Sequence, residues 1–420
     1  MEYPKLRPVE AFPAENGTIC LRDPVGISDK LVFLPVELYF IVTLFDGNHS
    51  ILDIQAAYTR RFGDLLFSAR VRDLVDKLDD CLLLESGRFE NAREKALEEY
   101  RAAASRPAVH AGHAYERERG ALLGQLDGLF GAGGGVSGMD EARAPASKAG
   151  GLRPDDGAAP GRLIALIAPH IDPRRGGECY AASYGELARR STAKTFVVLG
   201  ISHVQTERRF ALTAKDFETP LGLLHADREF IDCLSRRVGT DFTADELVHR
   251  SEHSVEFQAL FLRYVYPGRE EIRIVPILCS SRDEAATGRS PGEDPEFREF
   301  AGALGQTLSE RGDDTCLIAG VDLSHLGRRF GQNLVVDPAF LEKAEREDMA
   351  MIERIIDRDA GGFFRSIHEE RDRRNVCGVP AIYTLLTLIG AGRSRLLKYA
   401  QAVDQAAHSV VTFMAAAFYA

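Results

Sequence analysis

The sequence predicts an α/β domain whose sheet is largely parallel and covered on both faces, preceded by a small helical module. Two observations lead to this fold class. Beyond residue 162, short apolar runs alternate with amphipathic stretches of helical length, as in strand–helix–strand units. Before residue 96, helical patterns follow one another closely. The length of 420 residues also favours two domains over one.

The first predicted domain spans residues 1–95 and begins with three helices. The expected helices begin at a proline or a serine and cover residues 35–47, 50–63 and 68–81. The stretch LLLESGRFE that follows predicts a short hairpin around Ser86 and Gly87. Three helices and a hairpin together indicate a winged-helix-like module.

The charge of this module argues against the DNA binding that a winged helix suggests. Residues 1–100 hold 12 Lys and Arg against 18 Asp and Glu, a balance of −6 that repels phosphate. A peptide or protein partner is therefore expected. The helix order and the segment LFDGNHSILDI resemble the peptide-binding winged-helix modules known as PqqD-like. An appendage with a purely structural role is the alternative.

The second predicted domain spans residues 107–420 and contains an insertion. Residues 131–161 are rich in Gly, Ala and Pro and poor in large apolar side chains, which predicts a flexible segment. The rest of the domain contains five apolar runs that we expect to be strands. They are RLIALIAP, TFVVLGIS, RIVPILCS, TCLIAGVD and SVVTFMAAAFY. The stretches HSVEFQALFLRYVY and AEREDMAMIERIIDR predict helices between them.

The bulk composition excludes several classes of protein. The formal net charge of −11 disfavours nucleic-acid and anionic-membrane partners. No stretch approaches the roughly 20 apolar residues that cross a bilayer, and the first residues lack an apolar signal region. We therefore expect a cytoplasmic protein. The seven cysteines are scattered without a CxxC pair, which predicts free thiols in a reducing compartment.

Three of the apolar runs lead directly to residues that can do chemistry. LIALIAP leads to His170, TFVVLGIS to His203, and TCLIAGVD to Asp322 and then His325. One histidine after a strand is usually a satisfied polar residue. If the strands are parallel, however, all three ends emerge at one edge of the sheet, where open α/β proteins bind ligands.

Two further segments supply candidate ligands and catalysts. SEHSVEFQALF places His253 and Glu256 on one face of a helix, and RNVCGVPAIYTLL places Cys377 at a helix start that favours its thiolate. The alternatives are a solvated helix start and a small buried residue. Two histidines and a thiolate suit Fe, Zn or Cu better than Mg or Ca. His325, Asp322 or Glu256 would then act as acid or base, or orient a ligand imidazole.

Nine short motifs, in order along residues 107–420, resemble the Memo family in the form called AmmeMemoRadiSam system protein B. They are VHAGHAY, IAPHID, VLGISH, FETPLG, EHSVEFQ, VPIL, GVDLSHLG, NVCGVPAI and KYAQ. The family fold resembles that of the class III extradiol dioxygenases, which are non-haem iron enzymes. The resemblance implies that this domain has a dioxygenase-like sheet with flanking helices.

The resemblance also implies roles for individual residues. The metal site would consist of His170, His203 and Cys377, with iron(II) as the favoured metal and copper as the other choice. Asp322 and His325 fall on further positions of the family site.

The cleft around this site is where the sequence departs from the family. The resemblance places His110 and His253 beside the cleft, whereas the segment APHIDPRR puts Asp172 and Arg174 next to the metal, where the family often has APHAGY. The iron dioxygenases use two histidines and a carboxylate. A thiolate from Cys377 would make a more electron-rich site, so dioxygenase activity does not transfer automatically.

The expected function is a metal-dependent oxidoreductase acting on a peptide or small aromatic substrate. His325 would be the acid or base, and Asp322, Glu256 and His253 would assist it. The resemblance implies a radical-SAM enzyme and an AMMECR1-like protein as partners. Two alternatives stay open: a scaffold or metal-handling protein that uses the same cleft, and a metal-free enzyme with Cys377 as nucleophile and His325 as base.

Overall fold

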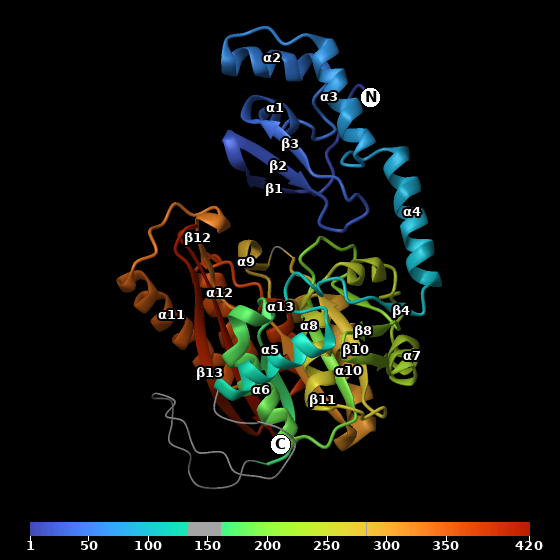
Figure 1. Cartoon of the computed structure of the whole chain (residues 1–420), viewed down its shortest axis with the longest axis vertical. Coiled ribbons are helices and arrows are strands. Elements are labelled where there is room, and N and C mark those ends of the chain that lie inside the picture. The colour runs from blue at the N-terminus through green and yellow to red at the C-terminus, as the bar shows by residue number, and fades with distance from the viewer. Residues whose placement is uncertain (133–160, 283) are drawn as a thin grey trace. The chain divides into compact units, whose positions relative to one another are not determined.

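The computed structural model describes residues 1–132 and 161–420, except residue 283 (Figure 1). The segment predicted to be flexible, 131–161, lies outside the described residues except at its ends. The chain divides into two compact units: Met1–Ala104 with His203–Gln205, and Ser105–Ser202 with Thr206–Ala420. Among the described residues, no helix has the length and apolar character needed to span a membrane.

The first unit contains a three-stranded antiparallel sheet and four helices. The strands, in the order β1-β2-β3, are β1 (Glu10–Pro13), β2 (Thr18–Arg22) and β3 (Val32–Pro35). The helices are α1 (Val36–Val42), α2 (Ile51–Phe62), α3 (Ser68–Asp80) and α4 (Gly87–Ala102). The three predicted helices are confirmed as α1, α2 and α3.

Local sequence explains where α2 begins and ends. Ser50 accepts a hydrogen bond from the Asp53 N–H, and the Asp53 carboxylate accepts one from the Ser50 N–H, which completes the capping box. Gly63 follows α2 with a φ of 73°, a left-handed conformation that glycine adopts without strain. The large apolar side chains of α3 face the core of this unit, and they are Val71, Leu74, Val75 and Leu78.

The predicted hairpin around Ser86 and Gly87 is wrong, because α4 begins at Gly87. The Ser86 hydroxyl accepts a hydrogen bond from the Phe89 N–H at 3.2 Å, so Ser86 caps a helix instead of opening a turn. The residues that follow are mostly Glu, Arg, Ala and Lys, which favour a helix. The sheet of this unit precedes α1, and its winged-helix-like and PqqD-like character stays a prediction.

The second unit is built on one large sheet whose centre is parallel. The central strands, in spatial order, are β5 (Leu163–Ala168), β11 (Thr315–Gly320), β6 (Thr195–Ile201) and β10 (Arg273–Cys279). Each is parallel to its neighbours in this series. Together with β14 (Ser409–Tyr419), they confirm all five predicted strands.

The sheet as a whole is mixed, which corrects the expectation that it is largely parallel. β14 runs antiparallel to β5, to β12 (His325–Gly327) and to β13 (Arg393–Asp404). Four residues join β13 to β14, and so short a connection forces an antiparallel pair. The remaining strands lie beyond or beside β10, and they are β9 (Gly222–Ala226), β8 (Asp216–Thr219), β4 (Ser105–Arg106) and β7 (Phe210–Leu212).

Helices cover both faces of the central strands. Leu199 of β6 and Ala319 of β11 pack in one core with α10, α12 and α13. Gly200 and Gly320, which alternate with them, face α8 instead. The helices of this unit are α5 (Arg119–Ala132), α6 (Pro173–Arg190), α7 (Arg228–Arg237), α8 (Ser254–Val265), α9 (Glu284–Thr287), α10 (Pro295–Arg311), α11 (Pro338–Ile356), α12 (Ala360–Glu369) and α13 (Val379–Leu388).

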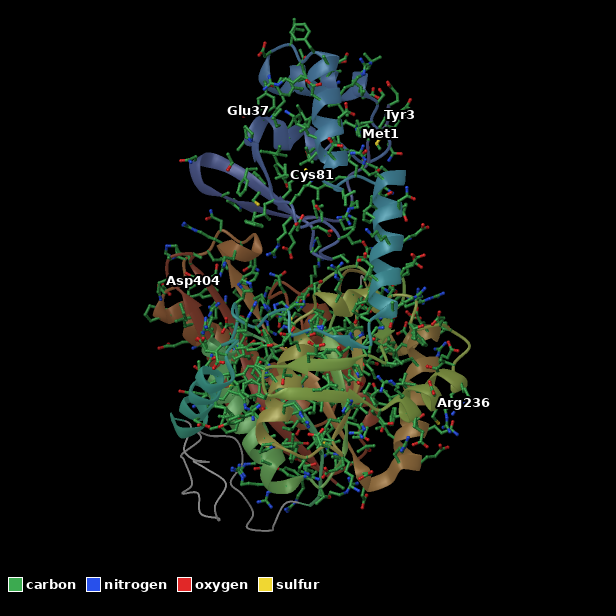
Figure 2. The ribbon with its side chains drawn as sticks, turned by 45° about the vertical axis from the view of Figure 1, so that its right-hand side comes forward. Met1, Tyr3, Glu37, Cys81, Arg236 and Asp404 are labelled. Carbon is green, nitrogen blue, oxygen red and sulfur yellow. The ribbon has the colours of Figure 1, made fainter. Side chains whose placement is uncertain are left out.

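All seven cysteines are free thiols, as predicted. Burial raises the pKa of the Cys316 thiol to about 12 and the pKa values of Cys179 and Cys279 still further, so these three are inert at neutral pH. Cys81, which Figure 2 labels at the end of α3, Cys233 and Cys377 are partly exposed. Cys377 is the one that lies at the predicted site.

Candidate functional site

Three neighbouring parallel strands deliver the first members of the site. His170, Asp322 and His203 each follow their strand, β5, β11 and β6, by two residues. The buried Asp322 carboxylate joins two of these strand ends, because its Oδ1 accepts hydrogen bonds from the backbone N–H groups of His170 (3.0 Å) and Ile171 (3.2 Å). The edge of the sheet that the sequence indicated therefore does gather polar side chains.

The hydrogen bonds of His170 determine which of its nitrogens can act as a ligand. Its Nδ1 lies 3.1 Å from the carbonyl oxygen of Gly320, which can only accept, so Nδ1 carries the proton and Nε2 the lone pair. That Nε2 lies 3.3 Å from the Cys377 Sγ and 3.6 Å from the Asp322 Oδ2. The imidazole is 2% exposed, so this lone pair faces the interior of the site.

Three histidines have nitrogens close enough together to hold one metal ion. One ring nitrogen from each of His170, His203 and His253 lies within 4.8 Å of the other two. The three side chains are respectively buried, exposed and intermediate. The sequence predicted His170 and His203 as ligands, but it assigned His253 to catalysis and named Cys377 as the third ligand. Among the described residues, the geometry groups His253 with the two histidines. Cys377 lies beside this group, with its Sγ 3.3 Å from His170 Nε2.

The residue before His253 orients its ring. The Nδ1 of His253 lies 3.1 Å from the Glu252 Oε1, and a carboxylate oxygen accepts the proton on that nitrogen. The lone pair is then on Nε2, as it is in His170, whose ring centroid lies 5.1 Å away. The same Glu252 oxygen accepts hydrogen bonds from the backbone N–H groups of His253 and Ser254.

A glycine allows α8 to start directly on the end of β6. Ser254 Oγ donates to the carbonyl of Ile201 and accepts from its N–H, both at 3.0 Å. A Cβ on Gly200 would lie 2.6 Å from this Oγ, so only glycine permits the approach. His253, the residue before α8, is held at the strand end by this contact.

A second glycine brings Cys377 to the same edge from the other face of the sheet. Gly378 caps α13, and a Cβ there would lie 2.6 Å from the carbonyl oxygen of Asp322. The Cys377 Sγ lies 3.6 Å from that carbonyl. The predicted position of Cys377 at the entry to an apolar helix is therefore confirmed.

Glu256 holds the surroundings of the site together. It is fully buried and forms an ion pair with Arg106, which is also fully buried. Its Oε1 accepts hydrogen bonds from the Tyr115 hydroxyl (2.5 Å) and the His110 N–H (3.0 Å). Burial and then the Glu256 charge raise the pKa of the Tyr115 hydroxyl, so it stays protonated as a donor. None of these contacts is with the imidazole of a predicted ligand or with His325, so the orienting role of Glu256 stays a prediction.

Arg106 belongs to this arrangement, and the sequence did not indicate it. Its guanidinium also donates to the carbonyls of His249 (2.9 Å) and Glu252 (2.7 Å), in the loop before α8. Arg106 and Glu256 lie 150 residues apart, so no local pattern could have shown the pair. His110 lies beside His253 with ring centroids 5.7 Å apart.

The predicted residues His325, Asp172 and Arg174 contact neighbouring segments of the chain. His325 begins β12, with its Nδ1 3.1 Å from the Leu323 carbonyl oxygen and its ring against Phe330. Asp172 caps α6 by accepting from the Arg174 N–H at 2.7 Å, and burial raises the pKa of its carboxyl. The Arg174 guanidinium binds Glu116 at 3.0 Å. The catalytic and cleft roles given to these residues stay predictions.

Comparisons with known proteins cover the whole chain. A family model described as Memo-like protein matches residues 106–417. A MEMO1 family protein of Aquifex aeolicus is 27% identical over 419 residues, which are 99% of this chain and 100% of the relative. One from Methanopyrus kandleri is 32% identical over 255 residues, 60% of this chain and 81% of the relative. One from Thermus thermophilus is 26% identical over 350 residues, 83% and 92% of the two chains.

Proposed function

Because the chain belongs to the Memo-like family, we propose that it is a metal-dependent oxidoreductase with a single-metal site at the carboxyl ends of β5, β6 and β11. One observation carries the proposal: nitrogens of His170, His203 and His253 lie within 4.8 Å of one another. The Cys377 thiol adds a fourth donor, 3.3 Å from His170 Nε2.

The donor set fits a transition metal. Imidazole and thiolate ligands suit iron and copper, whereas Mg and Ca require oxygen ligands. In both His170 and His253 the Nδ1 lies 3.1 Å from an oxygen that can only accept, so Nδ1 carries the proton and Nε2 can coordinate. We propose iron(II) as the metal, with copper as the alternative, held by His170, His203 and either His253 or Cys377. The bound metal would supply one-electron redox chemistry.

Residues beside Cys377 would accept the proton that its thiol must lose when it binds the metal. A thiol must lose its proton to become a ligand. Two acceptors lie beside the Cys377 Sγ: His170 Nε2, at 3.3 Å, and the Asp322 carbonyl oxygen, at 3.6 Å. The Asp322 carboxylate lies 3.6 Å from that Nε2, and it is proposed as the group that takes the proton when Nε2 is a ligand. His325 is proposed as the acid or base toward a peptide or small aromatic substrate, with a radical-SAM enzyme and an AMMECR1-like protein as partners.

Metal content tests the proposal. Protein purified without oxygen and reconstituted with ferrous iron or cuprous copper should hold metal near stoichiometry, and His170→Ala and His203→Ala should lose it. Comparing His253→Ala with Cys377→Ala identifies the third ligand. His249→Gln is the matched control, because that histidine is buried outside the group. Full metal retention in His170→Ala would overturn the assignment.

A second candidate is metal-free thiol chemistry, which the 3.3 Å contact between the Cys377 Sγ and His170 Nε2 favours. This contact makes His170 a base for the thiol, in addition to His325, which the sequence suggested. Alkylation of Cys377 separates the two functions. Protection of the thiol by ferrous iron, reversed by a chelator, favours the metal site. Rapid alkylation that iron does not change favours the free nucleophile. A scaffold would instead keep its partner affinity in His325→Ala.

A further inference from the structure

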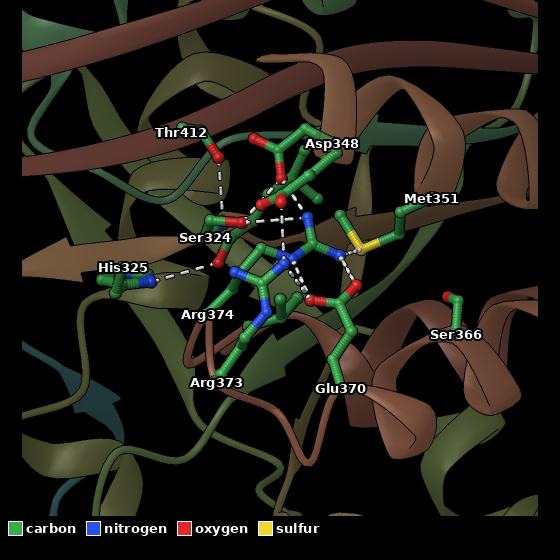
Figure 3. A network of polar contacts seen from close by, with 12 residues as sticks. Ser324, His325, Asp348, Met351, Ser366, Glu370, Arg373, Arg374 and Thr412 are labelled. Atoms are coloured by element: carbon green, nitrogen blue, oxygen red, sulfur yellow. Dashed lines mark hydrogen bonds and ion pairs between the residues drawn. The ribbon is translucent and has the colours of Figure 1, made fainter. Parts of the chain in front are cut away.

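Figure 3 shows Arg374, a buried arginine three residues before Cys377 in the sequence, within a network of polar contacts. Arg374 is 1% exposed, and its guanidinium spans two carboxylates. Its Nη1 lies 2.6 Å from Asp348 Oδ1, and its Nε and Nη2 each lie 2.9 Å from an oxygen of Glu370. A bidentate contact of this kind fixes direction as well as distance, which a lysine cannot reproduce.

Asp348 also contacts the segment that follows β11 and contains Asp322. Asp348 is fully buried in α11 and accepts hydrogen bonds from the Ser324 hydroxyl (2.6 Å) and the Tyr399 hydroxyl (2.8 Å). Burial raises the pKa of Asp348, and the contacts of Ser324 and Arg374 oppose that rise. Arg374 and Ser324 therefore share one buried carboxylate oxygen.

The backbone joins the same two segments directly. The His325 N–H donates to the Arg374 carbonyl at 2.7 Å, and the Asn375 side-chain amide donates to the His325 carbonyl at 3.1 Å. The Cys377 Sγ lies 3.6 Å from the Asp322 carbonyl oxygen. The segments 322–325 and 374–377 thus run side by side, and Arg374 anchors them both.

The loop needs such an anchor because its backbone is strained. Arg371, Asp372 and Asn375 have φ values of 54°, 46° and 49°, in the left-handed region that residues other than glycine rarely adopt. A conformation of this kind persists only where surrounding contacts hold it. The two carboxylate contacts of Arg374 are among the contacts that hold this loop, beside the Asp372 carboxylate, which accepts from the Val376 N–H at 2.8 Å.

We propose that Arg374, held by Asp348 and Glu370, is a positioning residue that sets the Cys377 thiol against His170. The proposal rests on the proposed function, since it concerns the same site. Arg374 touches neither metal nor substrate, and it acts through the backbone of the loop. In the network of Figure 3, Asp348 of α11, Glu370 directly after α12 and Ser324 beyond the end of β11 all contact Arg374.

Arg374→Lys tests the proposal, because lysine keeps the charge but cannot bridge Asp348 and Glu370. The matched control is Arg263→Lys, a buried arginine in the last turn of α8 that also contacts an acid, Glu270. Two readouts apply: cobalt(II) titration followed by the thiolate-to-cobalt absorption band, and the pH profile of Cys377 alkylation in metal-free protein, read by mass spectrometry.

Arg374→Lys should weaken cobalt binding by about 10- to 100-fold, the range found when groups that support a ligand are removed, and should diminish the thiolate band. Arg263→Lys should match the wild type. An unchanged band and alkylation profile in a folded Arg374→Lys protein would overturn the proposal. If the wild type binds no metal but the alkylation profile still shifts in Arg374→Lys, the positioning role stands and the proposed function fails.

Discussion

Glu256→Gln should destabilise the second unit, because it breaks an ion pair whose two side chains are both 0% exposed. Removing one charge of a buried pair typically costs about 3–5 kcal/mol, since the remaining charge is left uncompensated. Glutamine keeps one acceptor oxygen for Tyr115 or the His110 N–H, so the expected loss is at the lower end, about 3 kcal/mol. Arg106 is the charge left unpaired.

Urea denaturation followed by far-UV circular dichroism at neutral pH measures this loss. The surface variant Glu271→Gln, in which the lost partner is the exposed Arg269, is the control and should keep the wild-type midpoint. Replacing Arg106 and Glu256 together by Met should recover part of the stability, because the desolvation of both charges disappears. If Glu256→Gln unfolded like the wild type yet lost activity, Glu256 would act in the chemistry, and the supporting role argued from its contacts would be refuted.

Two further changes test the glycine and histidine arguments. Gly320→Ala should weaken metal binding, because its Cβ would lie 2.7 Å from the Gln258 side-chain amide. That amide donates to the carbonyl of Pro169, the residue before His170. Unchanged metal content would contradict this prediction. Burial lowers the pKa of His249 from 6.5 to about 4. Between these two pH values the unfolded chain binds a proton that the folded protein does not. The free energy of unfolding therefore falls as the pH is lowered from about 6.5 to about 4. The loss is about 3 kcal/mol, and the slope of unfolding free energy against pH should be smaller in His249→Gln; an identical slope would sink the argument.

The part of the site that follows strands could be predicted from sequence. The apolar runs before His170, His203 and Asp322 specify buried strands, and parallel strands end at one edge. The order β5-β11-β6 was not needed for that inference, because direction alone brings the ends together. The capping box of Ser50 and the apolar face of α3 could be predicted for a similar reason, since each depends only on residues a few positions apart.

Contacts between distant segments could not be predicted in this way. Arg106 reaches Glu256 across 150 positions, and Arg374 reaches Asp348 across 26, so neither pairing leaves a periodic signal. The Ser86-Gly87 pair misled because serine and glycine occur both in turns and at helix starts. Only the long run of helix-forming residues after it decides between the two, and a short window does not include that run.

The third ligand of the proposed metal site depends on both the fold and the chemistry of the donor. α8 and α13 cover opposite faces of the central strands, and each starts at the same sheet edge, one with His253 and the other with Cys377. Two positions of different chemistry therefore flank His170. Among the described residues, His253 shares the close group of nitrogens with His170 and His203, whereas Cys377 lies beside that group, with its Sγ 3.3 Å from His170 Nε2. Thiolate favours copper(I), whereas imidazole suits iron as well as copper. A metal that stays in Cys377→Ala but leaves in His253→Ala would identify His253 as the third ligand of the proposed site and would argue against copper(I) held by a thiolate.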